Sequence, residues 1–409
     1  MIKTPTSERL KIVVFGRRNA GKSSLINQIA KKEVTIVSDI AGTTTDPVNF
    51  SMELAELGPV VFVDTAGIDD EGELGRLRIK KAEEKLSIAD LCLFVTPSNL
   101  PIIDKEKEFY LKIKDKKPCI VVFTYFENED KIEPSKQFLL KEKWIGVDNI
   151  KSLGIVELKK KIIQTKEFIN PEPGLLDNIV NEQDFVLLVT PIDLAAPKGR
   201  LILPQIETIR ELLDKDCGVF IVKERELKYF YDSINPKPKL VITDSQVFHK
   251  VAADLPPEQN LTSFSILMAN KKGDLLPFIK SLSKISQLKA NSKILILEMC
   301  NHHAQPDDIG TVKIPRLINQ FIEPTISFTW EKKIEDSSDI DNFDAIIICG
   351  GCMVTRNYYS SMIKLIEEKD IPILNYGIFL AWVNGLIPRA IKIFPQLYEI
   401  YNELYIDKI

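Results

Sequence analysis

The sequence predicts an α/β protein made of three consecutive segments. Short apolar runs alternate with charged, helix-periodic stretches, which is the pattern of a parallel sheet with crossover helices. At 409 residues the chain is too long for one ordinary hydrophobic core, so two or three domains are expected. The proline- and glycine-containing stretch NPEPG at 170–174 is typical of a linker and ends the first segment.

Composition narrows the class of protein. The chain is 44% hydrophobic and 27% charged, as folded proteins are, and its net charge is -4 with lysine and arginine scattered along it. Binding of nucleic acid by a large basic face is therefore not expected. No apolar run is long enough to span a bilayer, and the first residues lead into a strand without a cleavage-type signal. We expect a cytoplasmic protein that binds neither membranes nor nucleic acid.

The first segment, residues 1–170, has apolar strands KIVVF, PVVFVD, LCLFV and CIVVF. Directly after the first strand comes GRRNAGKSS, with Gly16, Gly21, Lys22 and Ser23 in a G-x-x-x-x-G-K-S pattern. Glycines let backbone N–H groups surround phosphates, and the following helix N-terminus favours negative charge. The lysine reaches the terminal phosphates and the serine can ligate Mg²⁺. This context predicts a nucleotide-binding loop, to which Asn19, Ala20 and Ser24 also belong.

Two further motifs follow the loop in the order of a nucleotide switch. DTAG ends the second apolar strand, where Asp64 can hold Mg²⁺ through water and the Gly67 amide can face a third phosphate. Between the two motifs lies AGTTTD, and resemblance to GTPases of the Era and TrmE type assigns closure on the metal to Thr44. Catalysis is thus expected from Lys22, Ser23, Thr44, Asp64 and Gly67. Ile68 stands where Ras-like proteins have a water-orienting glutamine, so intrinsic hydrolysis should be slow or depend on another group.

The base-recognition motif departs from the N-K-x-D pattern of GTPases. The fourth apolar strand is followed by Thr124-Tyr125-Phe126-Glu127, in which only Glu127 keeps acceptor geometry for the guanine edge. The later S-A element corresponds to Asp148-Asn149. Guanine preference is inferred from resemblance. Asn19 matches relatives that place K⁺ beside the phosphates, and an ordinary turn asparagine is an equal alternative.

The middle segment, residues 177–264, has strands FVLLVT and KLVIT and a helix QIETIRELLDK, with no recognisable catalytic group. The third segment, residues 265–409, has strands KILILE, DAIIIC and IPILN. Two of these strands run directly into cysteine, at Cys300 and Cys349, and neighbouring parallel strands would bring these ends together. Cys352 follows after two glycines that allow a sharp turn.

Three thiols fit a 4Fe-4S cluster with one iron that lacks cysteine, and zinc bound by three cysteines and a histidine is the rival. Strand alternation places Glu298 on the face of Cys300, so Glu298 and His302 are the candidate fourth ligands. A solvated carboxylate and a surface imidazole are the alternatives for these two residues.

A nucleotide-binding loop followed by C-x-H and C-x-x-C resembles the HydF family of FeFe-hydrogenase maturation GTPases. TPIDLAAPKGRLILPQ (190–205), VITDSQVF (241–248), LTSFSILMA and KKGDL (within 261–275) are also similar to HydF sequence. The histidine that precedes the paired cysteines in that family is Ile348 here. The resemblance implies an Era- or TrmE-like P-loop GTPase domain, a dimerisation domain and an iron-sulfur domain.

The same resemblance implies that the chain is a homodimeric scaffold. Such a scaffold receives a di-iron precursor made with radical-SAM maturases and passes it to apo FeFe hydrogenase. The implied cofactors are GTP, Mg²⁺, K⁺ and a 4Fe-4S cluster. Two alternatives are a nucleotide-regulated zinc or redox protein and a tRNA-modification or ribosome-assembly GTPase. The second is weakened because the chain lacks a basic RNA-binding tail.

Overall fold

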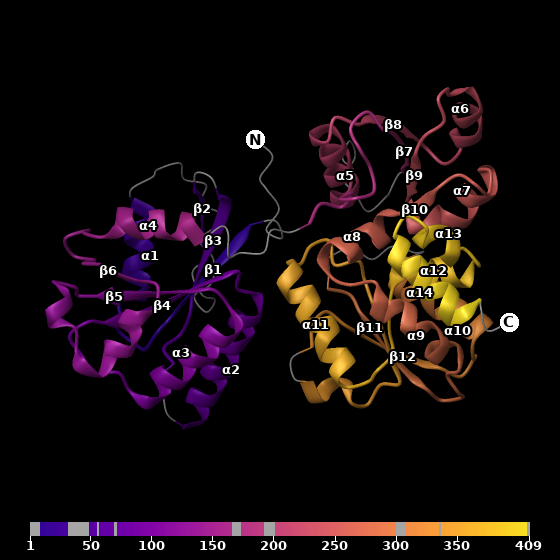
Figure 1. Ribbon diagram of the computed structural model, residues 1–409. Coiled ribbons are helices and arrows are strands. Elements are labelled where there is room, and N and C mark those ends of the chain that lie inside the picture. Colours follow the sequence, from indigo (N-terminus) through magenta and orange to yellow (C-terminus); the bar gives the residue numbers. More distant parts are fainter. Residues whose placement is uncertain are drawn as a thin grey trace. The chain divides into compact units, whose positions relative to one another are not determined.

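A computed structural model describes residues 9–31, 49–54, 57–68, 72–165, 173–191, 201–299, 308–334 and 337–406 (Figure 1). The chain forms two compact units, residues 1–171 and 172–409. The first unit contains the predicted nucleotide-binding segment, and the second contains both remaining segments. Among the described residues, no helix has the length and apolar character needed to cross a membrane.

The described part of the first unit is one six-stranded sheet in the order β2-β3-β1-β4-β5-β6. All neighbours pair in parallel except β2 and β3, which are antiparallel. Its strands are β1 (Leu10–Phe15), β2 (Asn49–Leu54), β3 (Gly58–Asp64), β4 (Leu91–Pro97), β5 (Cys119–Thr124) and β6 (Trp144–Gly146). Its helices are α1 (Lys22–Lys31), α2 (Gly72–Ile88), α3 (Asp104–Lys116) and α4 (Ile155–Gln164).

Helices cover both faces of this sheet, which explains the continuous apolar runs of its strands. Alternate residues of β1 enter different cores. Ile12 and Val14 pack with α1 and α4, whereas Val13 and Phe15 pack with α2 and α3. Both faces of the central strands are therefore buried, and their functional groups reach solvent at the strand ends.

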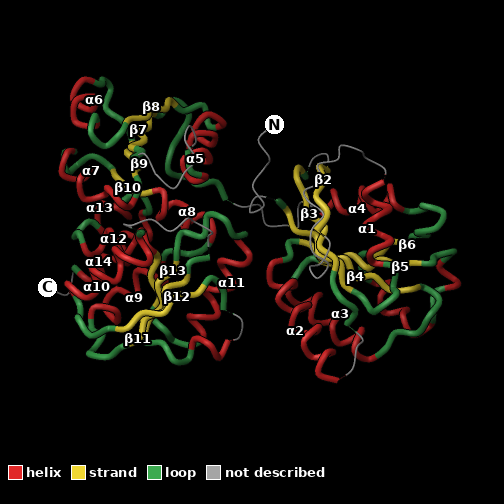
Figure 2. Tube along the Cα trace, turned by 180° about the vertical axis from the view of Figure 1, so that it is seen from behind, coloured by secondary structure: helices red, strands yellow, loops and turns green. Residues whose placement is uncertain are grey.

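The second unit begins with a four-stranded parallel sheet in the order β10-β9-β7-β8 (Figure 2). The strands are β7 (Phe185–Val189), β8 (Gly218–Val222), β9 (Leu240–Thr243) and β10 (Leu261–Ser263). The helices around it are α5 (Leu203–Asp214), α6 (Leu227–Ser233), α7 (Phe248–Asp254) and α8 (Phe264–Lys272). Strand β8 is an edge strand with exposed positions, and the other three strands are almost completely buried.

A second four-stranded parallel sheet follows, in the order β12-β11-β13-β14. Its strands are β11 (Lys293–Leu297), β12 (Ser327–Glu331), β13 (Ala345–Ile348) and β14 (Ile373–Asn375). Its helices are α9 (Leu276–Ser286), α10 (Ile314–Phe321), α11 (Arg356–Glu368), α12 (Tyr376–Val383), α13 (Ile387–Ile391) and α14 (Pro395–Tyr405).

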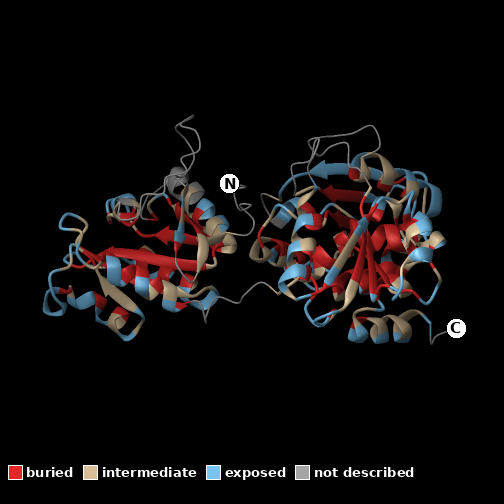
Figure 3. Cartoon of the chain, turned by 90° about the horizontal axis from the view of Figure 1, so that it is seen from above, coloured by how far each residue is buried: buried red, intermediate tan, exposed pale blue. Residues whose placement is uncertain are grey.

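The two sheets of the second unit share one hydrophobic core, which joins Val241 of the first sheet to Ile346 of the second. Figure 3 shows the buried strands between more exposed helices in each unit. Helix α8 faces both sheets, because Phe264 belongs to a core under the first sheet and Ile266 to the shared core. The expected boundary between residues 264 and 265 coincides with the start of α8, and independent folding of the two segments stays a prediction.

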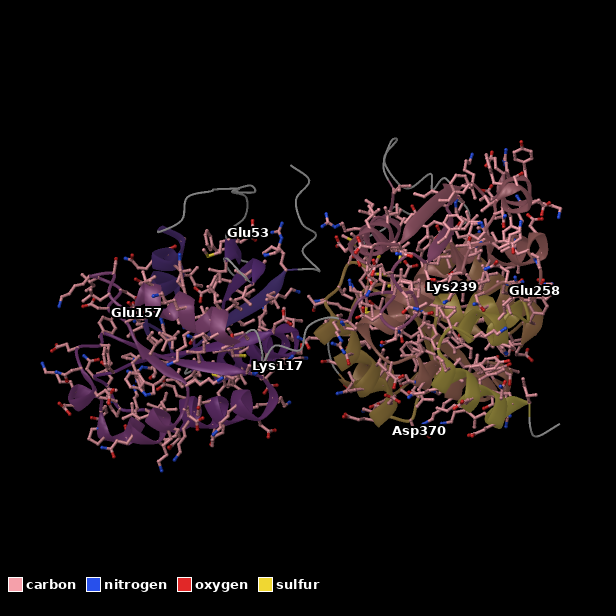
Figure 4. All side chains as sticks on the ribbon, turned by 45° about the horizontal axis from the view of Figure 1, so that its top comes forward. Glu53, Lys117, Glu157, Lys239, Glu258 and Asp370 are labelled. Atoms are coloured by element: carbon pink, nitrogen blue, oxygen red, sulfur yellow. The ribbon has the colours of Figure 1, made fainter. Side chains whose placement is uncertain are left out.

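The expected α/β class and parallel sheets are confirmed. Strands β11 and β13 are parallel neighbours, as the cysteine argument required. The sequence patterns missed β2, β6, β8, β10 and β12, all of which are edge strands. Strands β6 and β10 have only three residues, and β8 and β12 are partly exposed. Charged side chains such as Glu157 and Asp370 lie on the outside of their units, in agreement with the scattered charge (Figure 4).

Candidate functional site

The nucleotide-binding motif forms the loop between β1 and α1, at the carboxyl end of the central strand of the first sheet. Gly16 leaves β1 with φ of 151°, and a Cβ atom there would lie 2.1 Å from the Val95 carbonyl oxygen. Only glycine fits this close approach of two backbones. The loop therefore begins against β4, with the N-terminus of α1 as its other end.

Three of the expected catalytic residues lie close together in this loop and at the end of β3. The Lys22 ammonium donates to the carbonyl oxygens of Gly16 (2.9 Å) and Arg17 (2.8 Å). The Ser23 hydroxyl donates to Asp64 at 2.5 Å, so the two groups expected to hold Mg²⁺ are in contact. An ammonium beside a hydroxyl and a carboxylate can neutralise phosphates and orient a divalent cation.

The remaining loop residues differ in exposure. Ala20 is fully buried, whereas Ser24 is exposed on the first turn of α1. Asn19 has φ of 59°, the left-handed conformation that asparagine tolerates better than most residues. This gives the turn interpretation of Asn19 a physical basis, while the expected K⁺ role stays a prediction. Gly67 is partly buried just after β3, and Thr44 lies outside the described residues.

Thr124, which interrupts the N-K-x-D pattern, makes a contact that the sequence did not predict. Its hydroxyl donates to the carbonyl oxygen of Ala20 at 2.7 Å in a buried setting. The Asn149 amide adds a second contact, from Nδ2 to the carbonyl oxygen of Gly21 at 3.2 Å. Thr124 at the end of β5 and Asn149, just after β6, thus both bond to the nucleotide-binding loop.

Tyr125 and Glu127 lie at the surface beside this loop. Tyr125 has φ of 53° and is 51% exposed. It lines a groove of about 440 Å³ together with Arg18 and Asn19. Glu127 pairs with Lys131, and the hydrogen bond from that ammonium lowers the pKa of the Glu127 carboxyl. Glu127 is therefore an accessible, ionised acceptor, as base recognition would require.

Ile68, which replaces the water-orienting glutamine of Ras-like proteins, is a core residue. It is 2% exposed and packs in the cluster that contains Val13 and Phe94. Its side chain has no polar atom, so it cannot orient the attacking water. If a side chain orients the attacking water, it belongs to another residue.

A buried charged cluster lies beneath the loop and was not predicted. Arg17 lies 3.7 Å from Glu106, and both Glu106 and Lys136 are fully buried. Burial raises the pKa of the Glu106 carboxyl and lowers the pKa of the Lys136 ammonium to about 8. Lys136 also donates to the Pro97 carbonyl oxygen. These groups tie the nucleotide-binding loop to the segment between β4 and α3.

Two of the expected metal-binding cysteines, Cys349 and Cys352, follow β13 at the carboxyl edge of the second unit's second sheet. Leu297 and Ile348 are register partners at the ends of β11 and β13, and the Cys349 amide donates to the Leu297 carbonyl oxygen at 3.1 Å. Cys349 is buried and Cys352 is partly buried. Cys300 and His302 lie outside the described residues, and within the described ranges no group of three or more potential metal ligands occurs.

Glu298 lies one residue beyond the end of β11. Its position on the same face as Cys300 stays a prediction, because Cys300 lies outside the described residues. The Glu298 carboxylate accepts a hydrogen bond from the Tyr376 hydroxyl at 3.1 Å. Gly310 packs so closely that a Cβ atom there would lie 2.0 Å from the carboxylate. Glu298 is thus held by a buried tyrosine and a glycine at the same edge as Cys349.

Comparison with known protein families first gives the class of protein to which this chain belongs. A model of the 50S ribosome-binding GTPase family matches residues 11–125, so the chain contains a P-loop GTPase domain that binds GTP and Mg²⁺ and hydrolyses GTP. The hydrogen maturase F dimerization domain matches residues 175–273, and the hydrogen maturase F tetramerization domain matches residues 277–393. The chain belongs to the HydF family of hydrogenase maturation GTPases and contains that family's dimerization and tetramerization domains.

Individual relatives share the GTPase domain. The tRNA modification GTPase MnmE of Aquifex aeolicus is 34% identical over 158 residues, 38% of this chain and 34% of that protein. MnmE of Malacoplasma penetrans is 43% identical over 113 residues, 27% of this chain and 25% of that protein. The chain spans about a third or less of the length of these relatives.

Two solved structures are also similar. The G domain of the T. maritima FeoB iron transporter has 22% identity and a TM-score of 0.30, covering 38% of this chain and 98% of that chain. A variant of Aquifex aeolicus Era bound to GDP·AlF4⁻ has 20% identity and a TM-score of 0.31, covering 52% of this chain and 92% of that chain.

Proposed function

We propose that this chain is the scaffold and carrier in FeFe-hydrogenase maturation. Its third segment holds a 4Fe-4S cluster, receives a di-iron precursor as cargo and delivers it to apo-hydrogenase. GTP hydrolysis in the first unit acts as a regulatory switch. The partners are a second copy of the chain, the radical-SAM maturases and the apo-hydrogenase, all in the cytoplasm.

The observation that supports the cluster is the position of the cysteine pair. Cys349 follows β13 directly, and the neighbouring strand β11 ends shortly before Cys300 in the sequence. Thiols are the soft donors that iron-sulfur clusters take, and the Gly350-Gly351 turn lets Cys349 and Cys352 serve one centre. The donor set therefore fits a cluster, which would supply an iron open to exchange. Glu298 or His302 is the proposed labile ligand at that iron.

The nucleotide roles are proposed residue by residue. Lys22 and the loop residues bind the phosphates, Asp64 holds Mg²⁺ through water, and Gly67 faces the third phosphate. Ser23 and Thr44 ligate Mg²⁺, Asn19 binds K⁺, and Glu127 contacts the base. The loop residues meant here are Gly16, Asn19, Ala20, Gly21 and Ser24.

Metal analysis of anaerobically purified protein tests this proposal. We expect about four iron and four sulfide ions per chain. Replacing Cys300, Cys349 or Cys352 by serine should lower both sharply, while GTP hydrolysis persists because it occurs in the other unit. Cys217→Ser is the matched control, since Cys217 is a buried cysteine far along the chain from this loop. Stoichiometric zinc without iron in the wild-type protein would refute the scaffold.

A further inference from the structure

The loop that carries Cys349 and Cys352 is built around a buried lysine from another part of the second unit. Lys272 is the last residue of α8 and is only 2% exposed. Its ammonium donates to three carbonyl oxygens of the loop, those of Gly351 (2.8 Å), Cys352 (3.1 Å) and Val354 (2.5 Å). A lysine ammonium carries three N–H donors, so its hydrogen-bonding capacity matches this arrangement.

The loop conformation depends on these contacts and on its glycine turn. Gly351 has φ of 65°, and a Cβ atom there would lie 2.4 Å from the Tyr359 ring. The Tyr359 hydroxyl donates to the Cys349 carbonyl oxygen at 3.3 Å, and the Val354 amide donates to the Gly351 carbonyl oxygen at 3.1 Å. The backbone is thus fixed on both sides of Cys352.

The direction of the peptide groups follows from these bonds. In a planar trans peptide the N–H group points opposite to the carbonyl group. Because the carbonyl oxygens of Gly351, Cys352 and Val354 point toward the ammonium, the amides of Cys352, Met353 and Thr355 point away from it. Lys272 therefore determines both the path of the loop and the side on which the loop presents its amide donors.

Charge gives Lys272 a second effect. Thiolate ligands and a cluster are anionic, and a buried ammonium in contact with the ligand loop stabilises negative charge more strongly than an exposed one. The potential of an iron-sulfur centre depends on nearby charge and on hydrogen bonds. Loss of the ammonium should therefore make the reduced centre less stable.

We propose that Lys272 is the positioning residue of the metal-binding loop: its ammonium holds the Cys349–Cys352 backbone in the form that binds a thiolate-ligated metal. This inference rests on the proposed function for the identity of the centre. It also gives α8 a role, because this helix ends the region matched by the dimerization domain and acts on the loop of the following domain.

The test compares Lys272→Met and Lys272→Gln with Lys271→Met. Lys271 is the matched control, because it is adjacent to Lys272 and pairs with Glu207 on α5 at 3.0 Å. The first probe is Co²⁺ alone, titrated into cluster-free protein and followed by thiolate-to-cobalt absorbance. Both Lys272 variants should bind Co²⁺ about tenfold or more weakly, as loss of groups that orient metal ligands typically does. Lys271→Met should bind it as the wild type does.

The second readout is the reduction potential of the reconstituted cluster, which a change in fold stability alone would not move. It should become more negative in both Lys272 variants and stay unchanged in Lys271→Met. If Lys272→Met does not fold, Lys272→Gln provides the test. Wild-type Co²⁺ affinity and wild-type potential in the folded Lys272 variants would overturn the inference, as would a wild-type chain that does not bind Co²⁺. If Co²⁺ binding is weakened in the variants but the wild type holds no cluster, the proposed function is refuted and the inference about Lys272 stands.

Discussion

At the residue scale, Thr124 departs from the N-K-x-D motif and contacts the nucleotide-binding loop. Its hydroxyl bonds to the Ala20 carbonyl oxygen inside the nucleotide-binding loop. Thr124→Val preserves shape and removes the donor, which leaves a buried carbonyl unsatisfied at a cost of about 1–3 kcal/mol. If that cost falls on the bound state, GTP affinity decreases by roughly tenfold for each 1.4 kcal/mol.

Isothermal titration with a non-hydrolysable GTP analogue measures this effect. Thr124→Ser keeps the hydroxyl and should bind as the wild type does. Equal affinity in the valine and serine variants would show that the hydrogen bond does not support nucleotide binding.

Lys22→Ala should abolish GTP hydrolysis in a parallel assay, because charge stabilisation supplies most of this chemistry.

Lys136 predicts a pH dependence of stability. Burial lowers its pKa from 10.5 to about 8 in the folded state. Between these values the unfolded chain binds more protons at this residue, so its contribution to the free energy of unfolding rises with pH. Below about pH 8 both states are protonated and the contribution is least favourable.

Urea unfolding of wild type and Lys136→Met, at about pH 8 and about pH 10, isolates this group from other titrating residues. The wild type should gain stability relative to the variant on going to the higher pH. Lys114→Met, a change at an exposed lysine, is the control and should show no such gain. A difference between wild type and Lys136→Met that stays constant with pH would contradict the assignment.

The sequence predicted which residues of the first unit come together, and it missed how they are held. Ser23 and Asp64 belong to motifs whose order implies one metal site, and their side chains are in contact. The contacts of Thr124, Asn149 and Lys272 were not predictable, because each joins segments far apart in the chain. Hydrogen bonds of this kind depend on tertiary geometry, and no local periodicity signals them.

At the scale of elements, β8 has features suited to self-association. It is the edge strand of its sheet, and Ile221 is 40% exposed on it. Exposed apolar groups on an edge strand invite pairing with another chain. The dimerization domain that matches residues 175–273 contains this strand.

Ile221→Lys should therefore shift the protein toward monomer, because a charge opposes burial and pairing of this edge. Sedimentation velocity over a concentration series measures the change. Ile150→Lys, at a position 84% exposed in the first unit, is the control and should sediment as the wild type does. An unchanged association constant for Ile221→Lys would exclude β8 from the interface.

Strands with buried positions on both faces were predictable from their continuous apolar runs, as for β4, β5 and β13. Strand β12 was missed because it is mostly exposed and polar, with Ser327, Thr329 and Glu331 among its five residues. Edge strands need less burial, so their sequences carry less of the apolar signal. The cysteine argument assumed that β11 and β13 are neighbouring parallel strands, and their pairing in the sheet confirms this assumption.

At the scale of the whole molecule, the nucleotide-binding loop and the cysteine loop lie in separate compact units of one chain. The nucleotide site belongs to the first unit, and the cysteine loop belongs to the second. Removing a cysteine should therefore stop cluster-dependent delivery and leave GTP hydrolysis intact. This separation is what a carrier regulated by a nucleotide switch requires.

The most direct test of the proposed scaffold function is the hydrogen evolution that apo FeFe hydrogenase gains when it is mixed with this chain. Wild-type chain, matured anaerobically with the radical-SAM partners, is mixed with the apo-enzyme, and Cys349→Ser is treated identically. The wild type should activate the hydrogenase, while Cys349→Ser should hydrolyse GTP at the wild-type rate and give no activation. Equal activation by both proteins would contradict a scaffold function for the cysteine loop.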